Sequence, residues 1–148
     1  MGKVVYRGHI DGPFYGFDDG AVFKTEDGSY WRQARFRYWE HEEYMPEVVI
    51  EEVDGELVMT VAGESELVER IDDVEEAEIE GEFVGWDGTK RYTLADGREW
   101  EEYGYRYKFR YAYNPDVVLV RVGEATIMHV KGVHARVKPA GSEDPVVE

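Results

Sequence analysis

The sequence predicts an all-β protein made of two similar units in tandem. Apolar and aromatic residues alternate with polar ones along most of the chain, as in strands with one buried face. Glycine, proline and Asp-Gly pairs separate these runs, and no run has the caps and spacing of a helix. With 148 residues, 43% of them hydrophobic and 14% aromatic, the chain has enough apolar material to fold.

An internal repeat predicts the two units. Sliding the sequence along itself by 69 residues aligns Gly12 with Gly81 and Trp31 with Trp100. Other identical pairs are Asp27-Gly28 with Asp96-Gly97, Pro46 with Pro115, and Met59 with Met128. A shared alternation alone does not keep Gly, Pro and Trp in one register. We therefore expect a duplication with units at 1–71 and 72–138, followed by a flexible acidic tail at 139–148.

Turn signals divide each unit into five or six short strands. Asp27-Gly28 and Asp96-Gly97 are typical of hairpin turns that need positive φ. Pro46 and Pro115 open the next strands, at 48–53 and 117–122, where a missing N–H costs least. Strands at 57–61 and 125–130 follow, and closing strands run to Ile71 and Lys138. So many strands in about 60 residues suit a small closed barrel without exposed edges, so we expect two tandem SH3-like barrels.

The segment 103–113 has the clearest alternation in the chain. Every odd position is aromatic, and Arg106, Lys108 and Arg110 occupy even positions. On a strand this pattern gives one face of rings and one face of cations. We expect the rings to form the barrel core, with the tyrosine hydroxyls at its rim. In the alternative, some of them line an exposed groove together with tryptophans, namely Trp31, Trp39, Trp86 and Trp100.

The same segment carries a resemblance. The run from Trp100 to Val118, with its Tyr-x-Tyr-x-Phe-x-Tyr-Ala-Tyr-x-Pro strand, resembles an uncharacterised prokaryotic family of small SH3-like β-barrel domains. The resemblance covers about 60 residues and occurs twice. It is weaker in the first unit, where 42–46 reads Glu-Glu-Tyr-Met-Pro. It implies an SH3-like barrel in each unit and no catalytic residue.

Catalytic and metal-binding patterns are weak in this sequence. There is no Cys, and Ser29, Ser65 and Ser142 lie outside any nucleophile motif. The four histidines lack the short spacing of metal ligands. The carboxylates at 99, 101 and 102 are best explained as solvated strand positions in an acidic chain. We therefore expect no enzyme activity, no metal and no cofactor.

The charge balance restricts the possible partners. A net charge of −16 repels phosphate backbones, which disfavours nucleic-acid binding. Single-stranded nucleic acid remains an alternative through Arg106, Lys108 and Arg110, because cations interleaved with rings are typical of such binders. A second alternative is an acidic inhibitor or nucleic-acid mimic that occupies a basic protein site.

Together these features predict a non-enzymatic module that binds a protein or peptide, or acts as a scaffold. The candidate binding residues are Trp31, Trp39, Trp86, Trp100, Tyr107, Arg106, Lys108 and Arg110. Without a signal peptide or a run of about 20 apolar residues, we expect a cytoplasmic protein with no membrane association.

Overall fold

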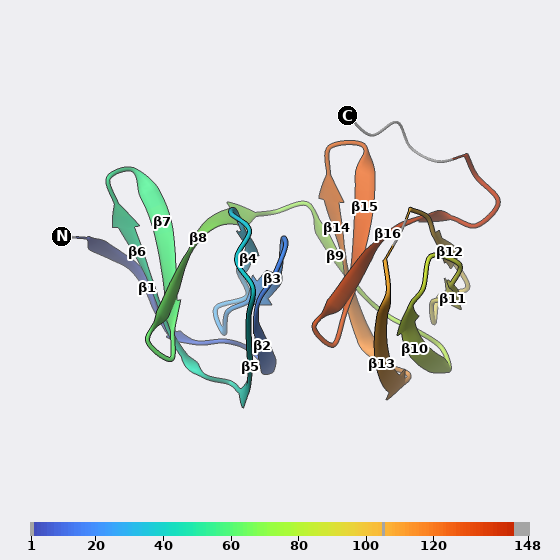
Figure 1. Ribbon diagram of the computed structural model, residues 1–148, viewed down its shortest axis with the longest axis horizontal. Coiled ribbons are helices and arrows are strands. Elements are labelled where there is room, and N and C mark those ends of the chain that lie inside the picture. The colour runs from blue at the N-terminus through green and yellow to red at the C-terminus, as the bar shows by residue number, and fades with distance from the viewer. Residues whose placement is uncertain (1, 105, 144–148) are drawn as a thin grey trace. The chain divides into compact units, whose positions relative to one another are not determined.

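The computed structural model describes residues 2–104 and 106–143, which form strands, turns and loops (Figure 1). The chain divides into two compact units, Met1–Asp72 and Asp73–Glu148. Every regular element in the described residues is a strand, and all strand pairs are antiparallel, so the all-β prediction is confirmed. None of these residues belongs to a helix that could cross a membrane.

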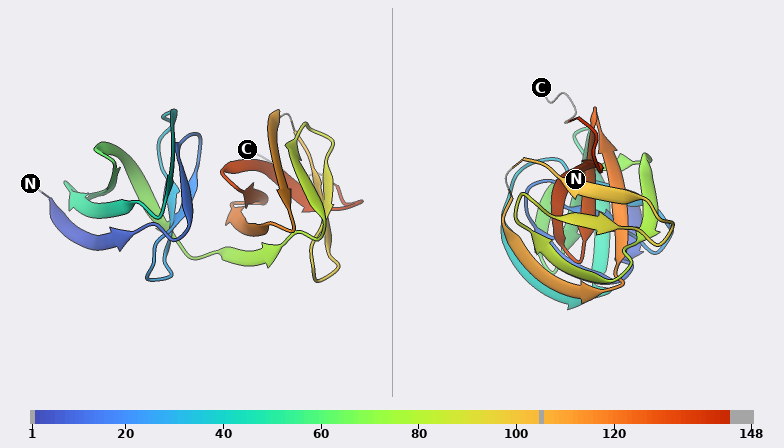
Figure 2. Two further views of the ribbon diagram at one scale, coloured as in Figure 1. Left: turned by 90° about the horizontal axis from the view of Figure 1, so that it is seen from below. Right: turned by 90° about the vertical axis from the view of Figure 1, so that its right-hand side faces the viewer.

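Unit 1 contains a six-stranded sheet of order β1-β6-β7-β8-β4-β3 and a two-stranded sheet of β2 and β5. The strands of the large sheet curve strongly (Figure 2). The strands are β1 (Lys3–His9), β2 (Pro13–Phe17), β3 (Val22–Lys24), β4 (Tyr30–Gln33), β5 (Trp39–Tyr44), β6 (Glu47–Val53), β7 (Glu56–Val61) and β8 (Glu64–Ile71).

Unit 2 has the same strand order, β9-β14-β15-β16-β12-β11, and a two-stranded sheet of β10 and β13. Its strands are β9 (Val74–Glu78), β10 (Glu82–Trp86), β11 (Arg91–Thr93), β12 (Glu99–Glu102), β13 (Lys108–Tyr113), β14 (Asp116–Val122), β15 (Ala125–Val130) and β16 (Val133–Pro139). The correspondence extends to a β-bulge, which lies between Phe14 and Gly16 in β2 and between Phe83 and Gly85 in β10.

Turns form where the sequence predicts them. Gly28 and Gly97 have φ of 87° and 92°, and each lies in the hairpin turn before β4 or β12. Their N–H groups donate to Thr25 O and Leu94 O at 2.9 Å. The two prolines at 46 and 115 immediately precede β6 and β14. β16 ends at Pro139, where we expect the tail to begin, and Ser142 N donates to Pro139 O at 3.1 Å. The rest of the expected tail, 144–148, lies outside the described residues.

Neither unit closes into a barrel, so this part of the prediction is wrong. In the described part of the chain, β5 pairs with β2 alone and β13 with β10 alone, which leaves each with one unpaired edge. The arginine two residues before each of these strands bonds to a backbone carbonyl group of the six-stranded sheet. Arg37 donates to Ser65 O and Arg106 to His134 O, both at 2.8 Å, at the second residues of β8 and β16.

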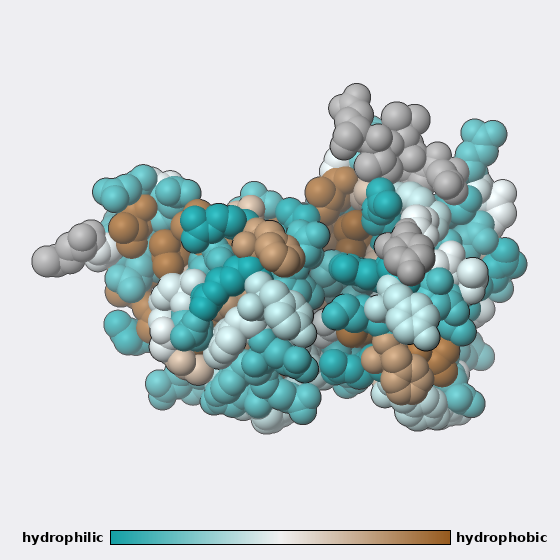
Figure 3. Space-filling view, in the orientation of Figure 1, coloured by the Kyte–Doolittle hydropathy of each residue, from teal (hydrophilic) through white to brown (hydrophobic). Residues whose placement is uncertain are grey.

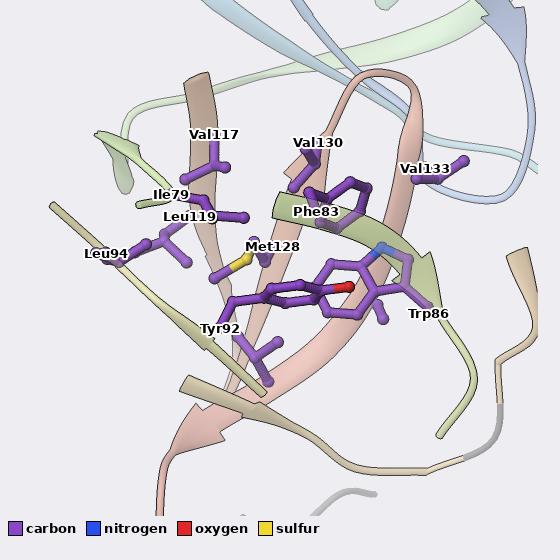
Figure 4. Close-up of a cluster of buried hydrophobic side chains, with 12 residues drawn as sticks. Ile79, Phe83, Trp86, Tyr92, Leu94, Val117, Leu119, Met128, Val130 and Val133 are labelled. Carbon is purple, nitrogen blue, oxygen red and sulfur yellow. The ribbon is translucent and has the colours of Figure 1, made fainter. Parts of the chain in front are cut away.

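Each unit has its own hydrophobic core. In unit 2, Phe83, Trp86 and Tyr92 pack ring against ring, with centroids 5.0–5.4 Å apart (Figure 4). The other buried members of this core are Ile79, Leu94, Val117, Leu119, Met128, Val130, Val133, Ala135 and Val137. Unit 1 buries the corresponding set of Ile10, Phe14, Phe17, Phe23, Trp31, Val48, Ile50, Met59, Val61 and Val68. From β13, only Ala112 packs against the unit 2 core as a partly buried hydrophobic residue.

Candidate binding surface on β13

The odd-numbered aromatic residues of β13 lie on the surface together with Tyr107, which immediately precedes the strand, and the four form what we call the ring face. Its members and their exposed fractions are Tyr107 (75%), Phe109 (77%), Tyr111 (56%) and Tyr113 (67%). Brown and near-white rings lie at the surface where Figure 1 places β10 and β13 (Figure 3). The prediction that these rings form the core is therefore wrong, because residues of the other strands already fill it. Tyr105, which belongs to the same sequence pattern, lies outside the described residues.

The arginines of this segment point away from the ring face, as the alternation predicts. Arg106 Nε donates to His134 O at 2.8 Å, and Arg110 Nη1 donates to Lys131 O at 2.7 Å. The two arginines are therefore engaged by carbonyl groups at and beside the start of β16. Lys108 lies opposite Trp86 in the β10–β13 register and is exposed.

The four tryptophans do not form one exposed groove. Trp31 and Trp86 are only 2% exposed and belong to the two cores, which corrects the prediction that they line a binding surface. Trp31 Nε1 donates to the buried Thr25 Oγ1 at 3.1 Å. Trp86 packs against the rings of Phe83 and Tyr92. Trp39 and Trp100 are half-buried against the cores of units 1 and 2. Tyr107 is the only aromatic candidate predicted for binding that lies fully at the surface.

Unit 1 carries acids where unit 2 carries two members of the ring face. Glu40 lies opposite Gly16 in the β2–β5 register, as Phe109 lies opposite Gly85 in the β10–β13 register. Glu42, two residues further along β5, is exposed like Glu40. Exposed rings occur in unit 1 only before and after these acids, at Phe36, Tyr38 and Tyr44. Among the described residues, the uninterrupted row of rings is a property of unit 2.

A pocket of about 220 Å³ adjoins the ring face. It is lined by Val84, Trp86, Asp87, Lys90, Tyr107, Lys108 and Phe109. The lining therefore combines the core indole, two members of the ring face, two lysines and one aspartate. Lys90 Nζ and Asp87 Oδ2 form an ion pair at 3.6 Å.

Glu102 is buried, although the sequence places it with solvated carboxylates. Its Oε1 accepts hydrogen bonds from Asp87 N at 3.1 Å and Lys90 N at 3.3 Å. Its Oε2 is buried and has no hydrogen-bond partner among the described residues. Burial raises the pKa of this carboxyl group.

The same position in unit 1 is occupied by Gln33, whose amide is fully bonded. Gln33 Oε1 accepts from Asp18 N at 2.8 Å, and Nε2 donates to Arg35 O at 2.9 Å and Arg37 O at 3.1 Å. The sequence register contains this signal, because a 69-residue shift aligns Gln33 with Glu102. Because an uncharged amide fills this position in unit 1, the fold needs a hydrogen-bonding side chain here and does not need a negative charge.

The remaining carboxylates of β12 serve in ion pairs. Glu99 and Glu101 contact Arg91 at 3.4 Å and 3.0 Å. No group of three or more His, Asp or Glu side chains in the described ranges has an arrangement that could hold a metal ion.

Comparisons of the chain with protein-family models, with curated proteins and with solved structures find no match. The resemblance to the SH3-like family therefore stays a prediction that rests on the residues quoted for it.

Proposed function

We propose that the chain is a non-enzymatic module whose ring face binds an extended peptide segment of a partner protein. The observation that carries this proposal is the row of four exposed rings at alternate positions, three on β13 and one, Tyr107, immediately before it. Such a row spans about 20 Å at the rise of a β-strand, which matches an extended peptide. Tyrosine offers a large apolar contact and a polar tip at a low cost in side-chain entropy.

The fold itself does not require these rings. Unit 1 has the same bulge and register, yet its strand carries Glu40 and Glu42 where unit 2 has Phe109 and Tyr111. Contiguous exposed apolar surface is uncommon in monomeric proteins and marks interaction sites. The rings of unit 2 are therefore best explained by a contact with another molecule.

A peptide fits this surface better than single-stranded nucleic acid does. A nucleic-acid groove combines stacking rings with cations that follow the phosphates. Here Arg106 and Arg110 extend from the opposite side of the strand and donate to carbonyl groups of the chain. The net charge of −16 further weakens binding to phosphates. The acidic-inhibitor alternative has no comparable observation in its favour, and we do not propose it.

We further propose that both units are open variants of an SH3-like fold that arose by tandem duplication. This proposal is supported by the shared strand order, the shared bulge and the parallel contacts of Arg37 and Arg106. SH3-like barrels bind extended or proline-rich peptides on aromatic surfaces, which agrees with the role proposed for the ring face.

The test is a selection from a library of random short peptides displayed on phage. The full chain is the bait, and the double variant Phe109→Glu/Tyr111→Glu is used for counter-selection, because it copies the acids of β5. Selected peptides should bind the wild type and lose affinity by about tenfold or more in the double variant, as expected for two aromatic anchors. The matched control is Tyr44→Glu in unit 1, which should leave the affinity unchanged.

Two results would overturn the proposal. One is a selection that yields no peptide able to distinguish the wild type from the double variant. The other is oligothymidine binding at low salt that depends on Phe109 and Tyr111, since this would assign the ring face to nucleic acid. Circular dichroism and thermal unfolding of the double variant check that its fold is intact.

A further inference from the structure

The pocket of unit 2 lies where unit 1 places a tryptophan side chain. In the β2–β5 register Trp39 lies opposite Phe17, and their ring centroids are 5.5 Å apart. Trp39 also contacts Phe14, at 6.1 Å between centroids. In the β10–β13 register the residue opposite Trp86 is Lys108, and its exposed side chain does not cover the core in this way.

A second residue difference between the units adds a positive charge next to this pocket. The backbone bond from Gln33 N to Ala21 O in unit 1 corresponds to the bond from Glu102 N to Lys90 O in unit 2, both at 2.8 Å. Ala21 packs against the unit 1 core, whereas Lys90 lines the pocket of unit 2. An indole and a methyl group in unit 1 are therefore replaced in unit 2 by two lysines around an apolar hollow.

We infer that this pocket holds an aromatic side chain of the bound peptide, with a carboxylate next to that side chain. The apolar walls formed by Val84, Trp86 and Phe109 suit a ring, as the packing of Trp39 in unit 1 illustrates. The volume of about 220 Å³ exceeds the ~150 Å³ of a cavity that accommodates benzene. Lys90 and Lys108 both line the pocket and complement a negative charge there. This inference rests on the proposed peptide-binding function and specifies the residue that anchors the peptide.

The carboxylate has two possible sources, the C-terminus of the peptide or a neighbouring Asp or Glu side chain. Three probes separate them: N-acetyl-tryptophan, N-acetyl-Trp-Glu-amide and N-acetyl-tryptophanamide, which carry a terminal, a side-chain and no carboxylate. Each is titrated into the full ¹⁵N-labelled chain, and amide shifts are followed by NMR. Val84, Asp87 and Tyr107 should shift, and at least one carboxylate probe should bind about two- to fivefold more tightly than the amide, as for a partly exposed ion pair.

Two variants of unit 2 that copy the corresponding residues of unit 1 provide the controls. Lys108→Trp places an indole where Trp39 lies in unit 1 and should abolish the shifts with all three probes. Lys90→Ala restores the alanine of unit 1 and should remove most of the preference for a carboxylate while the ring still binds. Should the Lys108→Trp chain fail to fold, Lys108→Met tests the charge at the same position and should also reduce that preference.

The inference is wrong if no probe shifts the pocket amides at millimolar concentration, or if the neutral amide binds as tightly as both acids. Its failure can be told apart from failure of the proposed function. Displayed peptides that bind the wild type and Lys108→Trp equally well would leave the ring face as the site and exclude the pocket. Probes that bind in the pocket while the library yields no peptide would exclude the peptide-binding function instead.

Discussion

Replacing Glu102 by glutamine should stabilise unit 2 at neutral pH. The buried carboxylate has bonds to Asp87 N and Lys90 N on one oxygen only, and its second oxygen has no partner among the described residues. In unit 1 the amide of Gln33 donates two hydrogen bonds from the corresponding nitrogen. Glu102→Gln should therefore keep the accepting oxygen and add a donor where the carboxylate is unsatisfied.

The expected magnitude follows from these contacts. An unsatisfied buried polar group costs about 1–3 kcal/mol, and each new neutral hydrogen bond contributes about 0.5–1.5 kcal/mol. We expect the free energy of unfolding of unit 2 to rise by about 1–3 kcal/mol near pH 8. The reciprocal variant Gln33→Glu should destabilise unit 1 by at least as much, because it loses both donated bonds and places an oxygen against two carbonyl groups.

The effect should depend on pH in a definite direction. Burial raises the pKa of Glu102 in the folded state above its unfolded value of about 4.3. Below that value both states are protonated and no penalty arises. As the pH rises towards the folded pKa, the unfolded state releases its proton first, and stability falls by up to about 1.4 kcal/mol per pH unit. Asp87, Asp96 and Glu101 have lowered pKa values and slopes of the opposite sign, so the difference between wild type and Glu102→Gln isolates this residue.

Pulsed hydrogen–deuterium exchange in rising urea, read by mass spectrometry, suits this chain because peptides from the two units report separately. The gain from Glu102→Gln should be larger near pH 8 than near pH 5 and confined to peptides of unit 2. Equal stability of wild type and variant at both pH values would refute the reasoning. So would a gain that does not grow with pH.

Three further substitutions test the packing described above. Met128→Ala removes a fully buried side chain and should lower the free energy of unfolding by about 2–5 kcal/mol in urea titrations; a cost near zero would contradict the core assignment. Gly85→Ala should release β13 from β10, because its φ is 103° and a Cβ would lie 2.1 Å from Lys108 O; unchanged exchange protection of β13 would argue against this close approach. Thr25→Val deprives Trp31 Nε1 of its buried acceptor and should cost about 1–3 kcal/mol by thermal unfolding, with an unchanged midpoint as the contrary result.

Local chemistry made much of the fold predictable from the sequence. Asp-Gly pairs need positive φ, and the prolines at 46 and 115 cannot donate to a ladder, so turns and strand starts fall where these residues stand. Barrel closure was not predictable in this way. Whether β13 pairs with β16 through backbone hydrogen bonds depends on residues distant in sequence. In the described residues these strands do not pair, and the side chain of Arg106 donates to His134 O instead.

The orientation of the aromatic strand shows a second limit. Alternation divides a strand into two faces, but it does not say which of them is buried. We expected the rings inside because they are the larger apolar groups, yet the core is filled from other strands and β13 adds only Ala112. The 69-residue register contained the contrary signal, since it aligns Phe109 and Tyr111 with Glu40 and Glu42. Acids at these two alternate positions predict that this side of the strand faces solvent.

The arginine contact at the open side of each unit has a consequence for motion. In the part of the chain that the structure describes, β13 and β16 are not paired, so separating them breaks the bond from the Arg106 side chain to His134 O and no ladder of backbone bonds. Elements held by few such bonds open at low free-energy cost and exchange their amide hydrogens earlier than core strands. The β10–β13 sheet should therefore fluctuate more readily than the six-stranded sheet, and a ligand on its outer side should slow amide exchange there most.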